Sequence, residues 1–291
     1  MQKKKRLLWG KALIATDLSE NSNEVVACVA KEGKDFAQKT KLVHVISVET
    51  AGGLNEAIEN ANKPAMECQI GMLRNAGIDA SYAFAYGIPS TEINRLIAEE
   101  KYQFLVLGSH SKSMVEEVFL GSVADSIISN LSVPALLIKC KGKKQAVCPL
   151  VFSGNILFPT DFSDNAKAAF ETLTNLSGNY SPAVTLYHVQ NKDVIPQDLD
   201  YKIEEYNRID TERLNKLKGT LLKAGARSVK IKIETGHAKQ TIIDEINNGN
   251  YDLVVMGAQG RGWIEEVFLG DIAHAVIRKS NTSLLLVPFR K

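Results

Sequence analysis

A chain of 291 residues, of which 45% are hydrophobic and 23% charged, has a globular composition and the length of about two domains. Because 35 basic side chains nearly balance 33 acidic ones, the net charge of +2 predicts neither nucleic acid nor a membrane surface as a partner. No segment approaches the ~20 apolar residues of a membrane span. The four cysteines form no CxxC pair, which predicts reduced thiols, a cytoplasmic location and no structural zinc or disulfide framework.

The first half of the chain alternates short apolar runs with helical patterns, which is typical of βαβ units in a parallel sheet. We expect five strands there, at residues 11–16, 41–47, 79–87, 104–109 and 135–139. Between the second and third strands lie Gly52, Gly53 and Pro64, which disfavour a helix. The helix of this connection is therefore expected to start late, with a mobile segment before Lys63.

A short basic segment, residues 139–154, leads into a second half with the same alternation. Five further strands are expected at residues 155–160, 183–190, 228–236, 253–258 and 283–288. The connection between the second and third of these strands has apolar residues at spacings near 3.6, which predicts one long helix. Its apolar face consists of Ile203, Tyr206, Leu214, Leu217 and Leu221.

The two halves repeat the same motifs in the same order. "LIATDLS" at residues 13–19 returns as "LFPTDFS" at 157–163, and "EEVFLG" at 116–121 returns at 265–270. The chain is thus a tandem duplication, with expected domains at residues 1–140 and 151–291. The predicted fold class is α/β, with two tandem Rossmann-like, doubly wound domains. Each is a five-stranded parallel sheet of order 3-2-1-4-5 flanked by helices, and a ligand would bind where the strand order reverses.

An aspartate follows the first strand of each half. Asp17 and Asp161 each come directly after a threonine and before a helix. A carboxylate there is most simply a helix cap or a turn residue, because its short side chain accepts hydrogen bonds from nearby amides. The alternative is an acceptor for a ribose hydroxyl or a base amine. The recurrence of the aspartate in both halves favours this second interpretation.

The segments after the fourth strands are rich in glycine. They are "LGSHSKSMVEEVFLGS" at residues 107–122 and "MGAQGRGWIEEVFLGD" at 256–271. Their spacing resembles the G-x2-G-x9-G-[ST] nucleotide motif of the universal stress protein family. The motif is matched by Gly257, Gly260 and Gly270 in the second half and by Gly108 and Gly121 in the first. The resemblance extends over essentially the whole chain, including the "TD" after the first strand, the "HV" that ends the second strand and the "GIP" that opens the third helix.

The motif has a physical basis, because glycines let the backbone approach a phosphate and adopt positive φ, while the following helix presents its first amides to an anion. The resemblance implies that the hydroxyl of Ser122 donates to a phosphate oxygen. It also implies that backbone groups near Val45 and Val189 contact the adenine edge. The implied ligand is an adenine nucleotide, AMP, ADP or ATP, with Mg²⁺ as an optional companion.

Each half departs from the motif at one position. Ser111 stands where the middle glycine of the first half is expected, which costs about 1–2 kcal/mol if that position is left-handed. Asp271 replaces the hydroxyl residue of the second half, and a carboxylate ~4 Å from a phosphate charge repels it by about 4 kcal/mol at an effective dielectric near 20. The second half adds Arg261, which can meet a phosphate from the side. We therefore expect unequal sites, the first better suited to a polyphosphate and the second able to take one phosphate.

The sequence favours a binding module over an enzyme, because it contains no GxxxxGK[ST] loop, GxSxG elbow or HExxH motif. His44 and His188 end equivalent strands and are expected to be packing residues. The leading interpretation is an adenine-nucleotide sensor or regulatory module of the stress response. Two alternatives stay open: a nucleotide-free scaffold that acts by association, and a slow ATPase in which Asp17 or Asp161 holds a divalent ion through water.

The last strand of each half is an apolar edge that must be covered or paired. These strands are "VPALLIK" at residues 133–139 and "SLLLVPF" at 283–289. We expect them to pair with each other inside the chain, in imitation of the family's homodimer. Association of two such chains is left open.

Overall fold

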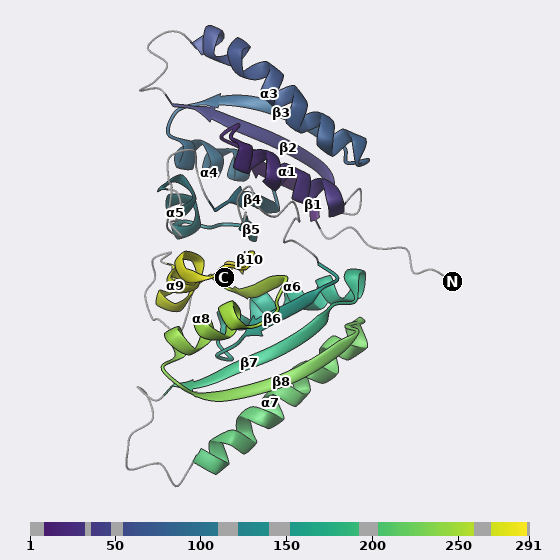
Figure 1. The fold of residues 1–291 in the computed structure, drawn as a ribbon, viewed down its shortest axis with the longest axis vertical. Coiled ribbons are helices and arrows are strands. Elements are labelled where there is room, and N and C mark those ends of the chain that lie inside the picture. The colour runs from purple at the N-terminus through teal and green to yellow at the C-terminus, as the bar shows by residue number, and fades with distance from the viewer. Residues whose placement is uncertain are drawn as a thin grey trace, which may run out of the picture. The chain divides into compact units, whose positions relative to one another are not determined.

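The computed structural model describes residues 9–32, 36–47, 55–109, 122–139, 152–191, 203–258 and 269–289. The chain divides into two compact units, Met1–Leu150 and Val151–Lys291. Each unit has a parallel sheet with helices packed against it (Figure 1). None of the described helices is long and apolar enough to cross a membrane.

The first unit is a doubly wound sheet. Its strands follow the order β3-β2-β1-β4-β5, and every described pair is parallel. Helix α1 packs beside α3 and α4 packs beside α5, which gives the two helix layers that this topology requires. The elements are β1 (Trp9–Ala15), α1 (Glu20–Glu32), β2 (Ala37–Ile46), α3 (Asn55–Asn75), β3 (Ala80–Tyr86), α4 (Pro89–Glu99), β4 (Phe104–Gly108), α5 (Ser122–Ser129) and β5 (Ala135–Ile138).

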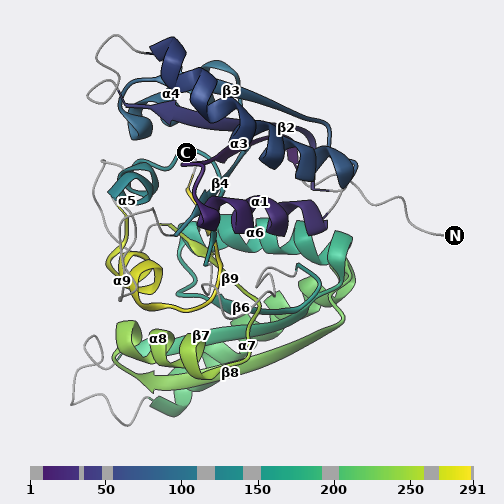
Figure 2. The ribbon, with the colours of Figure 1, turned by 45° about the horizontal axis from the view of Figure 1, so that its top comes forward.

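The second unit repeats this plan. Its strands follow the order β8-β7-β6-β9-β10, again with parallel pairing. Helix α6 packs beside α7, and α8 packs beside α9 (Figure 2). The elements are β6 (Asn155–Pro159), α6 (Asp164–Tyr180), β7 (Ala183–Asn191), α7 (Ile203–Ala224), β8 (Ser228–Gly236), α8 (Ala238–Asn248), β9 (Leu253–Gly257), α9 (Asp271–Lys279) and β10 (Leu284–Val287).

The apolar runs of the sequence become the buried strands of the two sheets. All residues of β5 and β10 are buried, as are the first four residues of β4 and of β9. Continuous apolar runs of this kind are typical of parallel strands that are covered by helices on both faces. All ten predicted strands are confirmed, and the largest shift is at β2, which begins at Ala37.

The prediction of a late-starting helix between β2 and β3 is wrong. Helix α3 begins at Asn55 and continues through Pro64. A proline inside a helix removes the hydrogen bond to the carbonyl four residues earlier, here that of Asn60. Both residues are exposed, so water can hydrate the freed carbonyl. The expectation of a mobile segment before Lys63 therefore fails for residues 55–62, and residues 51–54 lie outside the described part of the chain.

The expectation of four reduced thiols is also wrong. Cys28, a buried residue of α1, takes part in a disulfide bond, whereas Cys68 is a free, exposed thiol. Cys140 and Cys148 lie outside the described residues. The absence of a CxxC pair excludes only a disulfide bond between cysteines that are close in the sequence, because cysteines that are far apart in the sequence can approach each other in the fold.

Candidate functional site

The reversal of strand order lies between β1 and β4 in the first unit and between β6 and β9 in the second. Ile14 is paired with Val106 and Leu157 with Val254, so the carboxyl ends of these neighbouring strands meet at one edge. The predicted aspartates follow β1 and β6 at this edge, and the glycine-rich segments follow β4 and β9. The two groups of predicted site residues therefore approach each other in each unit, as expected for a doubly wound sheet.

The two aspartates form hydrogen bonds within their own turns. Asp17 Oδ1 accepts hydrogen bonds from the amide of Ser19, at 3.0 Å, and from the hydroxyl of Ser22. Asp161 Oδ1 accepts from the amide of Ser163, at 3.0 Å, and from its hydroxyl, at 2.6 Å. Because the N-cap of α6 is Ser163, Asp161 is a turn residue and not the cap. The turn interpretation is confirmed, and a ligand role for these carboxylates stays a prediction.

The residue after each aspartate has a left-handed backbone, a feature that the sequence analysis missed. Leu18 has a φ of 59° and Phe162 a φ of 62°. Their amides donate to the hydroxyls of Thr16, at 3.0 Å, and of Thr160, at 3.1 Å. A left-handed conformation costs a residue with a side chain about 1–2 kcal/mol. Strain of this kind accumulates at functional sites, and here it recurs at the same point of both copies.

The strand-ending histidines hold these turns in place. His44 Nδ1 lies 2.9 Å from the carbonyl oxygen of Thr16, and His188 Nδ1 lies 2.7 Å from that of Thr160. Since a carbonyl oxygen only accepts, Nδ1 is the protonated donor in both contacts. The packing role expected for the histidines is therefore extended, because each one ties the second strand of its unit to the turn after the first.

In the second unit, His188 also contacts helix α7. His188 Nε2 lies 3.3 Å from Asp210 Oδ2, which also accepts a hydrogen bond from Gln190 at 3.2 Å. Arg213 lies 3.7 Å from the other oxygen of Asp210, and its guanidinium is 5.3 Å from the ring centre of Phe162. Helix α7 is thus attached to β7 through Asp210 and to the strained turn through the contact of Arg213 with the Phe162 ring.

The first unit attaches its equivalent helix differently. The hydroxyl of Thr16 donates to Gln69 Oε1 of α3 at 2.8 Å, and Gln69 Nε2 donates to Asn23 of α1 at 2.7 Å. Gln69 is fully buried. The two copies therefore share the turn and differ in the side chains that support it.

The middle of each glycine-rich segment lies outside the described residues. This part includes four of the predicted site residues, Ser111, Gly121, Gly260 and Arg261. The predicted site residues that are described lie at the two ends of the segments: Gly108 at the end of β4, the backbone of Ser122 at the start of α5, and the second-unit residues Gly257, Gly270 and Asp271.

Gly257 has a packing role in the structure. A side chain there would place its Cβ 3.1 Å from the carbonyl carbon and oxygen of Asn165 in α6. The glycine therefore lets helix α6 lie close against β9. The packing of α6 against Gly257 fixes the end of β9, where the glycine-rich segment begins. A direct contact of Gly257 with a ligand stays a prediction.

Gly270 does not need the conformational freedom of glycine. It is the N-cap of α9 with a φ of −66°, which any residue adopts, and its amide donates to the carbonyl of Ala258 at 3.0 Å. The ability of glycine to adopt positive φ is therefore not used at Gly270, which begins α9 as expected. What the glycine supplies is space, because it places no side chain over the first amides of α9.

Asp271 begins α9 and forms an ion pair that the sequence analysis missed. Its side chain is 94% exposed, and Lys239 Nζ of α8 lies 3.2 Å from its carboxylate. Comparison of the two repeats could have identified Lys239, because in "GHAKQT" it occupies the position of Ser90 in "GIPSTE" of the first half.

Val45 and Val189 lie close to the carboxyl ends of their strands. Both are half-buried, and they are paired with Ala85 of β3 and Glu234 of β8. They are therefore at the same edge as the strained turns. Their contact with an adenine base stays a prediction.

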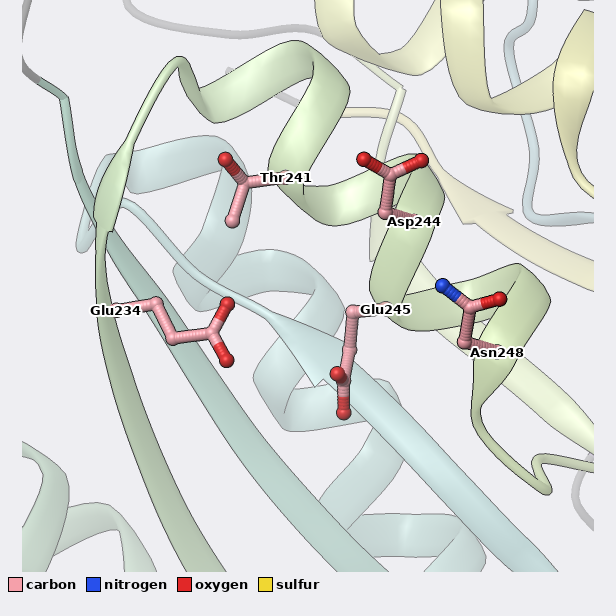
Figure 3. A pocket seen from close by; sticks show the side chains of 5 residues that line it. All are labelled: Glu234, Thr241, Asp244, Glu245 and Asn248. Carbon is pink, nitrogen blue, oxygen red and sulfur yellow. The ribbon is translucent and has the colours of Figure 1, made fainter.

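A pocket of about 280 Å³ lies between β8 and α8, away from the reversal of strand order (Figure 3). It is lined by Glu234, Thr241, Asp244, Glu245 and Asn248. Lys232 bridges Glu234 and Glu245, at 2.7 and 2.5 Å, and the hydroxyl of Tyr187 donates to Glu234 at 2.6 Å. The Lys232 ammonium and the Tyr187 hydroxyl hold the pKa of the Glu234 carboxyl below its usual value. These groups satisfy one another, and none of the predicted site residues lines the pocket. Among the described residues no cluster suited to a metal ion is present.

Comparison with known proteins gives consistent results for both units. The model of the universal stress protein family matches residues 9–139 and 153–288. Universal stress proteins MJ0531 and MJ0577 of Methanocaldococcus jannaschii are each 27% identical, over 147 and 158 residues. These matches cover 47% and 46% of this chain and 86% and 98% of the relatives, so each relative is about as long as one unit.

A solved structure supports the fold along almost the whole chain. It is a universal stress protein from Archaeoglobus fulgidus DSM 4304, 24% identical, with a TM-score of 0.74. The match covers 96% of this chain and 98% of that one. Because the family model matches once in each unit, the chain belongs to the universal stress protein family and carries two tandem copies of its domain.

Proposed function

We propose that the protein binds an adenine nucleotide, AMP, ADP or ATP, at the reversal of strand order in each unit and acts as a sensor or regulatory module. The observation that carries the proposal is the strained turn that recurs in both copies. There Leu18 and Phe162 follow the aspartates at the edge where the glycine-rich segments begin. The left-handed conformation lowers the stability of each unit, so its presence at the same point of two diverged copies is not explained by a gain in stability. A ligand that binds at this turn would explain it.

The chemistry of this edge suits a nucleotide. The carboxylates of Asp17 and Asp161 can accept from a ribose hydroxyl or a base amine through their remaining lone pairs. Gly270 leaves the first amides of α9 uncovered by a side chain, which favours a phosphate there. The glycine spacing adds a backbone that can approach a phosphate closely. A divalent ion such as Mg²⁺ would accompany a polyphosphate and need not be held by a dedicated protein site.

The two sites are expected to be unequal. The first unit has the hydroxyl of Ser122 at the start of α5 and no carboxylate at that position, which favours a polyphosphate. The second unit has Asp271 there and is expected to favour a nucleotide with fewer phosphates. A cytoplasmic location stays a prediction of the sequence, and association into a homodimer stays open.

The proposal is tested by identifying small molecules released from the purified protein by mass spectrometry, followed by calorimetric titration with AMP, ADP and ATP. Gly121→Leu and Gly270→Leu should each abolish one binding event, with GTP as the control ligand. Titrations with and without Mg²⁺ test the role of the ion. A protein that binds no adenine nucleotide would support the scaffold alternative, and many turnovers of radiolabelled ATP per minute would support the ATPase.

A further inference from the structure

The outer edge of the first sheet carries no charged residue. Strand β3 ends the strand order of its unit, and among the described residues it pairs with β2 alone. Its seven residues, ASYAFAY, include no charge, proline or glycine, and its register with β2 is regular. Proteins usually protect an edge strand with charges, proline or a bulge, because its outer backbone groups invite another strand. Strand β3 has none of these protections.

Three aromatic side chains form a row on one face of β3. Tyr82 and Phe84 are half-buried, and Tyr86 is 38% exposed. The rings of Tyr82 and Phe84 contact each other edge to face, with 6.0 Å between their centres. The hydroxyl of Tyr82 donates to Glu67 of α3 at 2.7 Å. The hydroxyl of Tyr86 donates to Glu59 of the same helix. Because both hydroxyls are paired, the row can be buried further without leaving a polar group unsatisfied.

The row is complementary to a second copy of itself. Residues 82–86 spell Tyr-Ala-Phe-Ala-Tyr, which reads the same in both directions. Antiparallel pairing across a two-fold axis at Phe84 would place Phe84 opposite its own copy and Tyr82 opposite Tyr86. Aromatic residues that lie opposite each other on neighbouring strands stabilise a sheet. On the other face of the strand, Ala83 would meet Ala85, so small residues also face small residues.

Charge opposes the same arrangement at the outer edge of the second unit. Strand β8 ends the strand order there, and two lysines and a glutamate lie along it. Pairing centred on its middle residue would bring Lys232 against Lys232 of the partner subunit, and like charges directly opposite each other destabilise a strand pair. The repeat places Ile231, Ile233 and Thr235 where β3 has its aromatic row. The chain therefore has one self-complementary outer edge, and a two-fold contact through one edge closes as a dimer.

We propose that two copies of the protein associate through β3, antiparallel across a two-fold axis at Phe84. This contact joins the first-unit sheets of the two chains into one continuous sheet. The occupant is a second copy because the palindromic, uncharged strand matches itself residue by residue. The interface does not depend on the proposed nucleotide site. One pair of strands is a small interface, so we expect a dissociation constant on the order of 10 µM.

Sedimentation velocity of the full chain, at protein concentrations on both sides of this value, measures the association. Phe84→Lys should weaken the dimer about tenfold or more, because it places two lysines opposite each other at the axis. The matched control is Ile233→Lys at the equivalent position of β8, which should leave dimerisation unchanged. Added salt should not weaken the wild-type dimer, because no ion pair joins the two strands. Thermal unfolding of each variant checks that the fold is retained.

Single cysteines test the register without introducing a charge. The background is Cys68→Ser, which removes the free, exposed thiol. Phe84→Cys should crosslink two chains on oxidation, because opposite residues have Cβ atoms ~4.5–5.5 Å apart. Tyr82→Cys alone should not react, since its two copies lie on opposite sides of the axis, whereas a mixture of Tyr82→Cys and Tyr86→Cys proteins should form the mixed dimer. Three results would overturn the inference: a monomer at every concentration, a dimer as tight in Phe84→Lys as in wild type, or Tyr82→Cys crosslinking with itself in preference to Tyr86→Cys.

Discussion

Gly257 is a position where a single methyl group should be costly. In Gly257→Ala the new Cβ would lie 3.1 Å from the backbone of Asn165, and a helix backbone cannot yield as a flexible side chain does. We expect a loss of about 1–3 kcal/mol in the free energy of unfolding, which is typical of overpacking. Urea denaturation measures this loss.

The matched control for Gly257→Ala is Gly219→Ala in α7. A Cβ at Gly219 would have no heavy atom within 4 Å, so alanine should stabilise the helix by about 1 kcal/mol. Opposite signs for the two variants would support the packing role of Gly257. If Gly257→Ala is as stable as wild type, the close approach of α6 does not require the glycine.

The burial of Lys139 is expected to make the stability of the protein depend on pH. It is 3% exposed, and burial lowers the pKa of its ammonium from 10.5 to about 8. Between these two values the unfolded chain binds more protons than the folded one, so the free energy of unfolding rises with pH across this window. Below pH 8 the full penalty of the buried charge remains, on the order of 3 kcal/mol.

Lys139→Met removes this penalty. We expect the variant to be more stable than wild type near neutral pH and the difference to shrink as the pH rises toward 10.5. Urea denaturation across this range measures the effect. The control is Lys167→Met in α6, an exposed lysine whose substitution should have little effect at any pH. Parallel stability curves for Lys139→Met and wild type would contradict the prediction.

At the scale of elements, α3 contains a residue that weakens it. Pro64 lies inside the helix, next to the exposed Lys63, and leaves the carbonyl of Asn60 without its usual backbone donor. Pro64→Ala should therefore raise the free energy of unfolding by about 1–3 kcal/mol, less than the full helix-interior cost because proline also restricts the unfolded chain. Calorimetric melting measures this, and Lys63→Ala, expected within about 0.5 kcal/mol of wild type, is the control. A lower melting temperature for Pro64→Ala would show that the proline is required.

The sequence predicted the elements better than it predicted their contacts. All ten strands follow from apolar runs, because a run such as "LVVM" in β9 is buried whatever surrounds the sheet. The start of α3 was missed because local glycine and proline preferences compete with the packing of Met66, Ile70 and Leu73 against the sheet. Tertiary packing decided the outcome.

The candidate site was predicted in outline and missed in its supporting contacts. The repeat located Asp161 and the glycines, since these are local motifs. The link from Phe162 through His188 to Asp210 joins residues that are far apart in the chain, and no periodicity reveals it. The left-handed φ of Leu18 and Phe162 was equally hidden, because neither residue type favours that conformation.

At the scale of the whole molecule, the duplication gives each unit an apolar last strand. Strands β5 and β10 are the last strands in the order of their own units and consist of the apolar runs "ALLI" and "LLLV". An apolar edge invites pairing with another strand. We propose that β5 and β10 pair with each other within one chain, which would satisfy both edges at once.

Cysteines introduced at Leu137 and Leu285 test this pairing. Residues that lie opposite each other on adjacent strands have Cβ atoms ~4.5–5.5 Å apart, close enough for a crosslink after small movements. We expect Leu137→Cys/Leu285→Cys to crosslink on oxidation within monomers isolated by gel filtration, with the bond mapped by mass spectrometry. Leu137→Cys/Leu221→Cys, which joins β5 to the buried face of α7, is the control that should not react. A crosslink found only between chains would move the pairing to a homodimer, and no crosslink in either form would contradict it.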